Sequence, residues 1–198
     1  MNTLVRLVSH LPKDPLIEKA YAFAAEAHAS IDQRRKYTDD PYIHHPVAVA
    51  RIVAARGGDV AMICTALLHD VIEDTPVTER EVRRAFGEEV GRMVPQITDI
   101  SRPEDGNRAV RKAIDREHLG RAEPRVKTVK LADLIHNSGS ILRHDPHFAK
   151  VYLKEKALVL PLLDEGDYRL QQIAHRLVIS GRRRLEEIRL QEALRPKP

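Results

Sequence analysis

Residues 61–74, with the sequence AMICTALLHDVIED, combine an apolar stripe with a cluster of acidic and histidine side chains. Apolar residues recur here at the i, i+3, i+4, i+7 spacing of a helix with one buried face: Cys64, Leu67, Leu68 and Val71. We therefore predict one helix that Asp59 caps and that reaches about Asp74. Its polar residues project from the opposite side: His69, Asp70, Glu73 and Asp74.

The segments on either side show similar helical periodicity. Capping residues, prolines and glycines predict helices over residues 15–30, 47–56, 59–74, 78–97, 108–119, 125–143, 147–165 and 167–194. Breaks or kinks are expected near Gly87, Pro95 and Gly181. No segment alternates as a strand does, which argues against a Rossmann fold, a P-loop enzyme and an α/β-hydrolase. We expect an all-α, compact multi-helix fold in a single domain over residues 1–198.

The composition narrows the class of protein further. The chain has 198 residues, enough for one core, and Lys and Arg exceed Asp and Glu by only 33 to 29, which does not imply nucleic-acid binding. The single cysteine, Cys64, is expected in the core, and the absence of any intrachain disulfide fits a reducing compartment. No apolar run reaches the ~20 residues of a membrane helix, and residues 1–13 lack a secretory signal. We therefore expect a cytoplasmic protein.

Two other segments carry polar side chains that could join the cluster after residue 68. In residues 129–137, VKLADLIHN, three of them fall on one helical stripe: Lys130, Asp133 and Asn137. In residues 42–46, YIHHP, the proline after His45 favours an extended conformation for that histidine. Its imidazole would therefore be held in place.

Three carboxylates beside one imidazole repel one another unless water or a cation lies among them. Two nitrogen and two oxygen donors would suit a divalent transition metal with open positions for water and substrate: His45, His69, Asp70 and Asp133. Manganese, iron and zinc are all chemically possible. His44 is the alternative ligand if the register shifts by one residue. Glu73 and Asp74 could position the attacking water or form a solvated helix end.

Several separated motifs, in this order, resemble those of the hydrolase domain of the RelA/SpoT superfamily: Arg35-Lys36, Tyr42-Ile43-His44-His45-Pro46, His69-Asp70, Glu73-Asp74 and Lys130-Leu131-Ala132-Asp133 with Asn137. The resemblance covers about residues 20–178, and the set is far more specific than a His-Asp pair alone. It implies an α-helical HD-domain phosphohydrolase. The chain is similar to the small stand-alone members that act on ppGpp-like alarmones, such as the metazoan SpoT homologues.

The resemblance also implies an activity and roles for individual residues. The metal would usually be Mn²⁺, and ppGpp or pppGpp would lose its 3′-pyrophosphate to give GDP or GTP. By matched position, the metal ligands would be His45, His69, Asp70 and Asp133. The catalytic residues acting on water would be Glu73 and Asp74. The substrate contacts would be Arg35, Lys36, Lys130, Asn137, Arg143 and Tyr152.

Two departures from the family pattern lie near the expected nucleotide contacts. The glycine usual after the Arg-Lys pair is absent from residues 37–40, YTDD, and Asn137 is followed by residues 138–140, SGS. (p)ppApp-type nucleotides and NADPH therefore remain alternative substrates. A nucleotide-binding sensor without turnover, or a partner-binding helical domain, is the alternative outside the enzymes. The expected partner is a small nucleotide, neither nucleic acid nor membrane, and the oligomeric state stays open.

Overall fold

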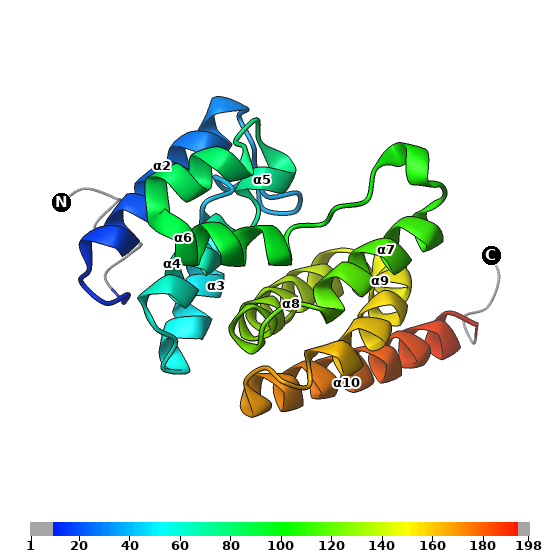
Figure 1. Ribbon diagram of the computed structural model, residues 1–198. Coiled ribbons are helices and arrows are strands. Elements are labelled where there is room, and N and C mark those ends of the chain that lie inside the picture. The colour runs from blue at the N-terminus through cyan, green and yellow to red at the C-terminus, as the bar shows by residue number, and fades with distance from the viewer. Residues whose placement is uncertain (1–9, 194–198) are drawn as a thin grey trace.

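The computed structural model describes residues 10–193, with side chains as far as residue 191 (Figure 1). Its elements are α2 Pro15–Ser30, α3 His44–Ala55, α4 Val60–Leu68, α5 Val71–Asp74, α6 Glu79–Ile97, η1 Pro103–Asp105, α7 Arg108–Gly120, α8 Pro124–His144, α9 Pro146–Val159, η2 Leu160–Leu163 and α10 Tyr168–Ala193. The described residues contain no strand, and Arg34 and Pro41 form an isolated β-bridge. The all-α fold is therefore confirmed. The two ends of the predicted domain lie outside the described residues.

Side-chain caps begin several of the predicted helices. The carboxylate of Asp14 accepts a backbone N–H at 2.8 Å before α2, and Asp59 accepts one at 2.9 Å before α4. Thr78 and Glu81 form a capping box at the start of α6. Such caps satisfy backbone donors that have no partner within the helix, so these local signals locate a helix start well.

The start of α3 differs from the prediction. We expected a helix from Val47 with His45 extended, but α3 begins at His44 and holds His45 in its first turn. Pro46 is tolerated there because the N–H it lacks would have no helical partner. The helical conformation before a proline is disfavoured, and burial of His45, which is 1% exposed, offsets that cost.

The helix predicted to reach Asp74 is divided into α4 and α5, and His69 and Asp70 lie in the turn between them. Asp70 has φ −101° and ψ −6°, away from regular helix values. The Nδ1 of His69 bonds to the carbonyl oxygen of Ala66 at 2.8 Å, and Asp70 accepts a hydrogen bond from the Tyr42 hydroxyl at 2.7 Å. The spacing predicted that the four polar side chains share one face of a continuous helix. The structure shows instead that a turn separates His69 and Asp70 from α5.

Other boundaries follow or shift the prediction. Gly87, with φ 81°, marks the expected break within α6, whereas Pro95 lies inside that helix without ending it. The long helix α10 passes through Gly181 undivided. Helix α9 ends at Val159, earlier than expected, and the 3₁₀ turn η2 follows it.

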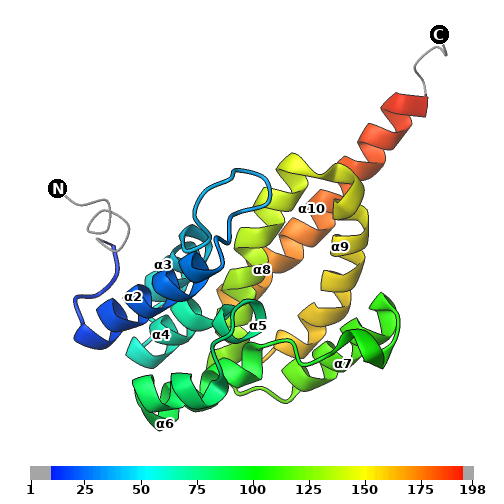
Figure 2. The same cartoon turned by 90° about the horizontal axis from the view of Figure 1, so that it is seen from above.

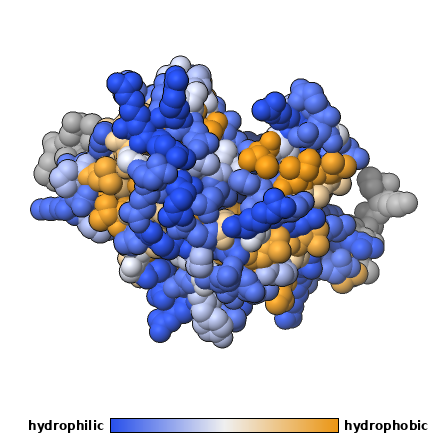
Figure 3. Space-filling model, viewed as in Figure 1, coloured by the Kyte–Doolittle hydropathy of each residue, from blue (hydrophilic) through white to orange (hydrophobic). Residues whose placement is uncertain are grey.

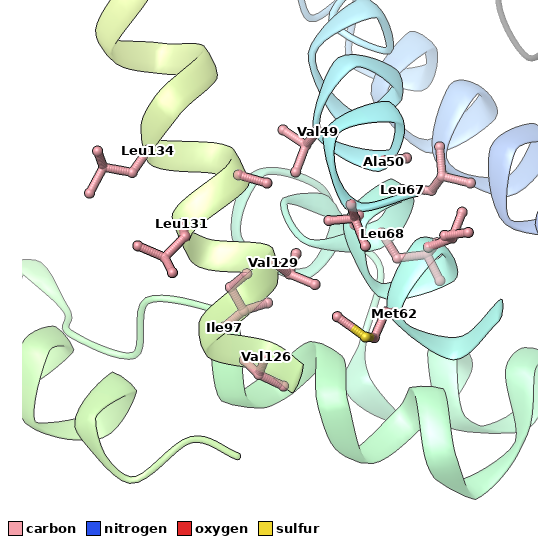
Figure 4. Packing of buried hydrophobic residues seen from close by; sticks show 14 of the residues in the cluster. Val49, Ala50, Met62, Leu67, Leu68, Ile97, Val126, Val129, Leu131 and Leu134 are labelled. Carbon is pink, nitrogen blue, oxygen red and sulfur yellow. The ribbon is translucent and has the colours of Figure 1, made fainter. Parts of the chain in front are cut away.

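Helix α8 is the centre of the arrangement and packs against α3, α4, α6, α9 and α10 (Figure 2). Val129 of α8, Val49 of α3 and Leu68 of α4 belong to one buried cluster (Figure 4). Cys64 is buried and free, as predicted. This core holds together the three segments that carry the motifs of the chain.

The surface shown in Figure 3 is mostly hydrophilic, with smaller apolar areas. Large apolar side chains that are exposed include Tyr168 and Ile179 on α10. Within the part of the chain that the structure describes, no helix has the length and apolar character needed to cross a membrane.

Candidate metal centre

Four side chains from three separated segments meet at one buried point. Helix α3 supplies His45, the turn after α4 supplies His69 and Asp70, and α8 supplies Asp133. The two histidine Nε2 atoms are 3.2 Å apart. The Nε2 of His45 lies 3.6 Å from Asp70 Oδ2 and 3.3 Å from Asp133 Oδ1, and the Nε2 of His69 lies 3.2 and 3.9 Å from the same two oxygens. The structure thus brings together the four predicted metal ligands.

These separations fit donors that share one small cation. With ligand bonds of about 2.0–2.2 Å, the donor atoms around an ion lie roughly 3 to 4 Å from their neighbours. His45, His69 and Asp70 are close enough to one another to hold an ion, and Asp133 approaches both histidines from α8. Imidazole and carboxylate donors suit manganese, iron or zinc. The residues therefore fit a divalent metal.

Neighbouring groups orient these donors. The amide of Asn137 donates to Asp133 Oδ1 at 2.6 Å, and the ammonium of Lys130 lies 3.1 Å from Asp133 Oδ2. The carbonyl of Ala66 accepts the Nδ1–H of His69, which leaves a lone pair on the Nε2 that faces the other donors.

The electrostatics keep both carboxylates ionised. Burial alone would raise the pKa of Asp70 and of Asp133, but the neighbouring positive groups outweigh it and hold both values well below their usual range. Lys130 is the main such group beside Asp133, and His69 beside Asp70. Burial lowers the pKa of His69, and the charge of Asp70 overcomes this and raises it to about 9. The two carboxylates thus favour positive charge at this point, which a divalent cation would supply.

Glu73 and Asp74, the predicted catalytic residues, lie on α5, which follows the His69-Asp70 pair. Burial raises the pKa of Glu73 to about 7, and the charge of Asp99 adds to the shift. Burial also raises the pKa of Asp74, whose Oδ2 accepts a hydrogen bond from Gln33 at 2.9 Å. The other end of the Gln33 amide, Oε1, lies 2.6 Å from His28 Nδ1. A carboxyl group that titrates near neutral pH is suited to moving a proton.

A cavity of about 350 Å³ opens beside His45. Its lining residues are Arg35, Thr38, Asp40, His44, His45, His136, Gly139, Ser140, Arg143 and His144. Arg35 donates to Asn137 Oδ1 at 3.2 Å, and Asn137 in turn donates to the predicted metal ligand Asp133. Two predicted substrate contacts, Arg35 and Arg143, thus line one cavity. The side chain of Lys36 is exposed, and its ammonium lies 3.4 Å from Asp145 Oδ2.

Lys36, Lys130, Asn137 and Tyr152 are predicted substrate contacts that do not line this cavity, and Tyr152 belongs to the core. Its ring is buried in the core, and its hydroxyl lies 3.4 Å both from the Leu134 carbonyl oxygen and from the Ser138 hydroxyl. Tyr152 belongs to α9, and its side chain therefore packs against α8 in the core.

A second polar cavity, of about 170 Å³, lies beside Glu73. Its lining residues are Glu73, Asp99, Ser101, Arg108, Arg111, Lys112 and Asp115. Three cations come from α7 at the i, i+3, i+4 spacing that places them on one helix face: Arg108, Arg111 and Lys112. Lys112 pairs with Asp99, and Arg108 makes two hydrogen bonds to Glu155 at 2.7 and 2.9 Å. The motifs in the sequence did not predict this cationic group. The i, i+3, i+4 spacing of the three cations on a polar helix could have indicated it.

The helical fold and the His-Asp pair at its buried centre are typical of HD-domain proteins, and comparison with known proteins agrees. A model of the HD domain family matches residues 20–159, and the chain belongs to this family. Within it, the chain is similar to the guanosine-3′,5′-bis(diphosphate) 3′-pyrophosphohydrolase MESH1 of Xenopus tropicalis. The two are 40% identical over 134 residues, which cover 66% of this chain and 72% of MESH1. The predicted resemblance to the RelA/SpoT hydrolase domains is confirmed.

Longer relatives and a solved structure extend the comparison. A probable GTP pyrophosphokinase of Mycobacterium leprae is 40% identical over 123 residues, which are 62% of this chain and 15% of that protein. A probable guanosine-3′,5′-bis(diphosphate) 3′-pyrophosphohydrolase of Synechocystis is 37% identical over 151 residues, 74% of this chain and 20% of that one. The chain thus spans a fifth or less of these two relatives. A solved structure, described as a metazoan ortholog of SpoT that hydrolyses ppGpp, matches with a TM-score of 0.76 and 25% identity, covering 85% of this chain and 97% of that one.

Proposed function

We propose that the protein is a metal-dependent hydrolase that removes the 3′-pyrophosphate of ppGpp or pppGpp and leaves GDP or GTP. The observation that carries the proposal is the buried set of four donors, with one polar cavity beside His45 and a second beside Glu73, each of which includes arginine side chains. The names of MESH1 and of the solved SpoT ortholog state this activity for those proteins. The match to this chain covers 72% of MESH1.

The metal ligands in this proposal are the four donors His45, His69, Asp70 and Asp133, and the metal is Mn²⁺. When bound, such an ion polarises a phosphoryl oxygen and lowers the pKa of water. The two carboxylates are already ionised and balance its charge. Lys130 and the Tyr42 hydroxyl hold those carboxylates in place.

In the proposed reaction, water attacks the phosphorus attached to the ribose 3′ oxygen. The bond between that phosphorus and the 3′ oxygen breaks, pyrophosphate leaves, and the 3′ oxygen takes up a proton. Glu73 accepts the proton that the attacking water loses, because its pKa near 7 allows it to be ionised at neutral pH. Asp74, held by Gln33, orients the same water.

The substrate carries phosphate groups on both the 5′ and the 3′ oxygen of its ribose. Each of these two groups requires cationic side chains to bind it. Arg35 and Arg143 would bind them at the larger cavity, where guanidinium groups can form paired hydrogen bonds to phosphate, and Lys36, next to Arg35 in the chain, would add a further positive charge. Arg108 and Arg111 would do so at the smaller one. Asn137 and Lys130 both contact Asp133 and complete the predicted contacts. Tyr152 would support α8 from behind.

A panel of nucleotides tests this proposal. The protein is incubated with ppGpp, pppGpp, ppApp and NADPH, with Mn²⁺ or with a chelator, and both pyrophosphate and phosphate are measured. We expect Mn²⁺-dependent pyrophosphate release from ppGpp and pppGpp. Phosphate from NADPH alone would assign another substrate, and nucleotide binding without any turnover would indicate a sensor. We also propose a cytoplasmic location and a small nucleotide, not nucleic acid, as the partner.

A further inference from the structure

His136, on α8, lies against the candidate metal ligand His45. Their Nδ1 atoms are 2.7 Å apart, which is hydrogen-bonding distance. The ring centroids are 4.9 Å apart and the ring planes differ by 29°, so the two imidazoles are nearly coplanar and meet edge to edge. One nitrogen must donate its proton and the other must accept it.

The proposed metal centre decides the direction of this hydrogen bond. The Nε2 of His45 faces His69, Asp70 and Asp133, so it needs a free lone pair there to bind a cation. A neutral imidazole with a lone pair on Nε2 carries its proton on Nδ1. His45 is therefore the donor, and His136 accepts through its own Nδ1.

We propose that His136 is a positioning residue of the metal centre, because it accepts the Nδ1–H of His45 and so fixes the tautomer and the ring orientation with which Nε2 binds a divalent cation. This inference rests on the proposed metal centre and assigns a residue that supports it. The comparison with His69 is direct, since the backbone carbonyl of Ala66 accepts its Nδ1–H. For His45 the acceptor is a side chain, and groups of this kind commonly set the affinity of a metal ligand.

The position of His136 adds a second consequence. Its ring also lines the cavity of about 350 Å³, together with Arg35 and Arg143. His136 therefore contacts both the proposed metal ligand His45 and the cavity proposed for phosphate groups. The rest of the cavity lining offers a control, because His144 lines it and stacks on Tyr37 at a centroid distance of 5.7 Å.

The test is the affinity for Mn²⁺ alone, measured by calorimetry or by competition with a fluorescent chelator. Leu and Asn have nearly the same shape, but only Asn offers an oxygen that can accept the Nδ1–H of His45. We expect His136→Leu to weaken Mn²⁺ binding about 10- to 100-fold, the usual effect of losing such a partner. His136→Asn should bind nearly as tightly as the unmodified protein, and His144→Leu should bind unchanged.

The outcomes distinguish a failure of the positioning role of His136 from a failure of the metal centre. Equal Mn²⁺ affinity in a folded His136→Leu protein and in the unmodified protein overturns the positioning role. If His136→Leu loses its helical circular dichroism, His136→Phe keeps a ring without an acceptor and carries the same test with the same expected loss. Failure of the unmodified protein to bind Mn²⁺ contradicts the metal centre itself, and that result is distinct from a failure of this inference.

Discussion

The two carboxylate oxygens of Asp133 contact different groups. Its Oδ1 faces the nitrogens of His45 and His69, and its Oδ2 lies 3.1 Å from the ammonium of Lys130. Burial would lower the pKa of Lys130, but the carboxylates around it, Asp133 foremost, raise that pKa, so the lysine carries a buried positive charge. Loss of the Asp133 carboxylate therefore removes a metal donor and the closest partner of a buried cation.

We predict that Asp133→Ala abolishes Mn²⁺ binding and ppGpp hydrolysis while the protein keeps its helicity at 25 °C with a lower melting temperature. The apolar core is untouched, so the fold should persist. Calorimetry, circular dichroism and pyrophosphate release check the three parts. Asp164→Ala, at an exposed acid, is the control and should change none of them. Normal hydrolysis by Asp133→Ala would remove this residue from the centre.

Glu73 predicts a pH dependence. Burial, with help from Asp99, raises its pKa to about 7, and a base must be ionised to accept a proton. The rate should therefore fall as the pH drops below about 7, with a bound cation moving the midpoint lower. Glu73→Gln should lower kcat by about 10² to 10⁴, remove that acidic limb and keep the Mn²⁺ affinity. A limb that persists in the Gln variant belongs to another group.

Helix boundaries that depend on local signals could be predicted from the sequence, whereas those that depend on long-range contacts could not. The caps Asp14, Asp59 and Thr78 act on backbone groups a few residues away, so the starts of α2, α4 and α6 could be predicted. The turn at His69-Asp70 could not, because a hydrogen bond from Tyr42, far along the chain, helps to hold it.

The site shows the same division. The metal ligands could be proposed from motifs that resemble a family, and the acids on α5 likewise. The role of Gln33 and the cationic cavity beside Glu73 depend on how α2, α5 and α7 meet in space. Spacing within one helix does not report such packing. The same holds for Tyr152, which the sequence placed at the substrate and the structure places in the core.

Two helix glycines predict opposite effects on stability. A Cβ at Gly91, in α6, would lie 2.7 Å from the Cα of Arg83, which follows from the bend at Gly87. Gly91→Ala should therefore destabilise the protein by about 1–3 kcal/mol. A Cβ at Gly139, in α8, meets nothing within 4 Å, so Gly139→Ala should stabilise it by roughly 0.5–1 kcal/mol. Urea unfolding of both variants checks the pair, and equal effects would contradict the packing of α6.

On the scale of the whole molecule, the core and the metal centre join the same segments. Helix α8 packs against α3 and α4, and its Asp133 meets their histidines where those helices approach it. An ion that binds only this folded arrangement stabilises it by mass action. Metal binding and global stability are therefore linked.

We predict that Mn²⁺ raises the melting temperature. At a free concentration 100 times its Kd, the ion should add about 2.7 kcal/mol to the free energy of unfolding. Differential scanning fluorimetry with increasing Mn²⁺ measures the shift, and a chelator should reverse it. The shift should be absent from Asp133→Ala, so the same shift in both proteins would mean that the ion binds elsewhere.

The most direct test of the central claim is pyrophosphate release from ppGpp by protein stripped of metal and then titrated with Mn²⁺. The account predicts no release without the ion, saturable recovery as Mn²⁺ is added, one GDP for each pyrophosphate, and no recovery in Asp133→Ala. Full release in the presence of a chelator, or no release at saturating Mn²⁺, would contradict it.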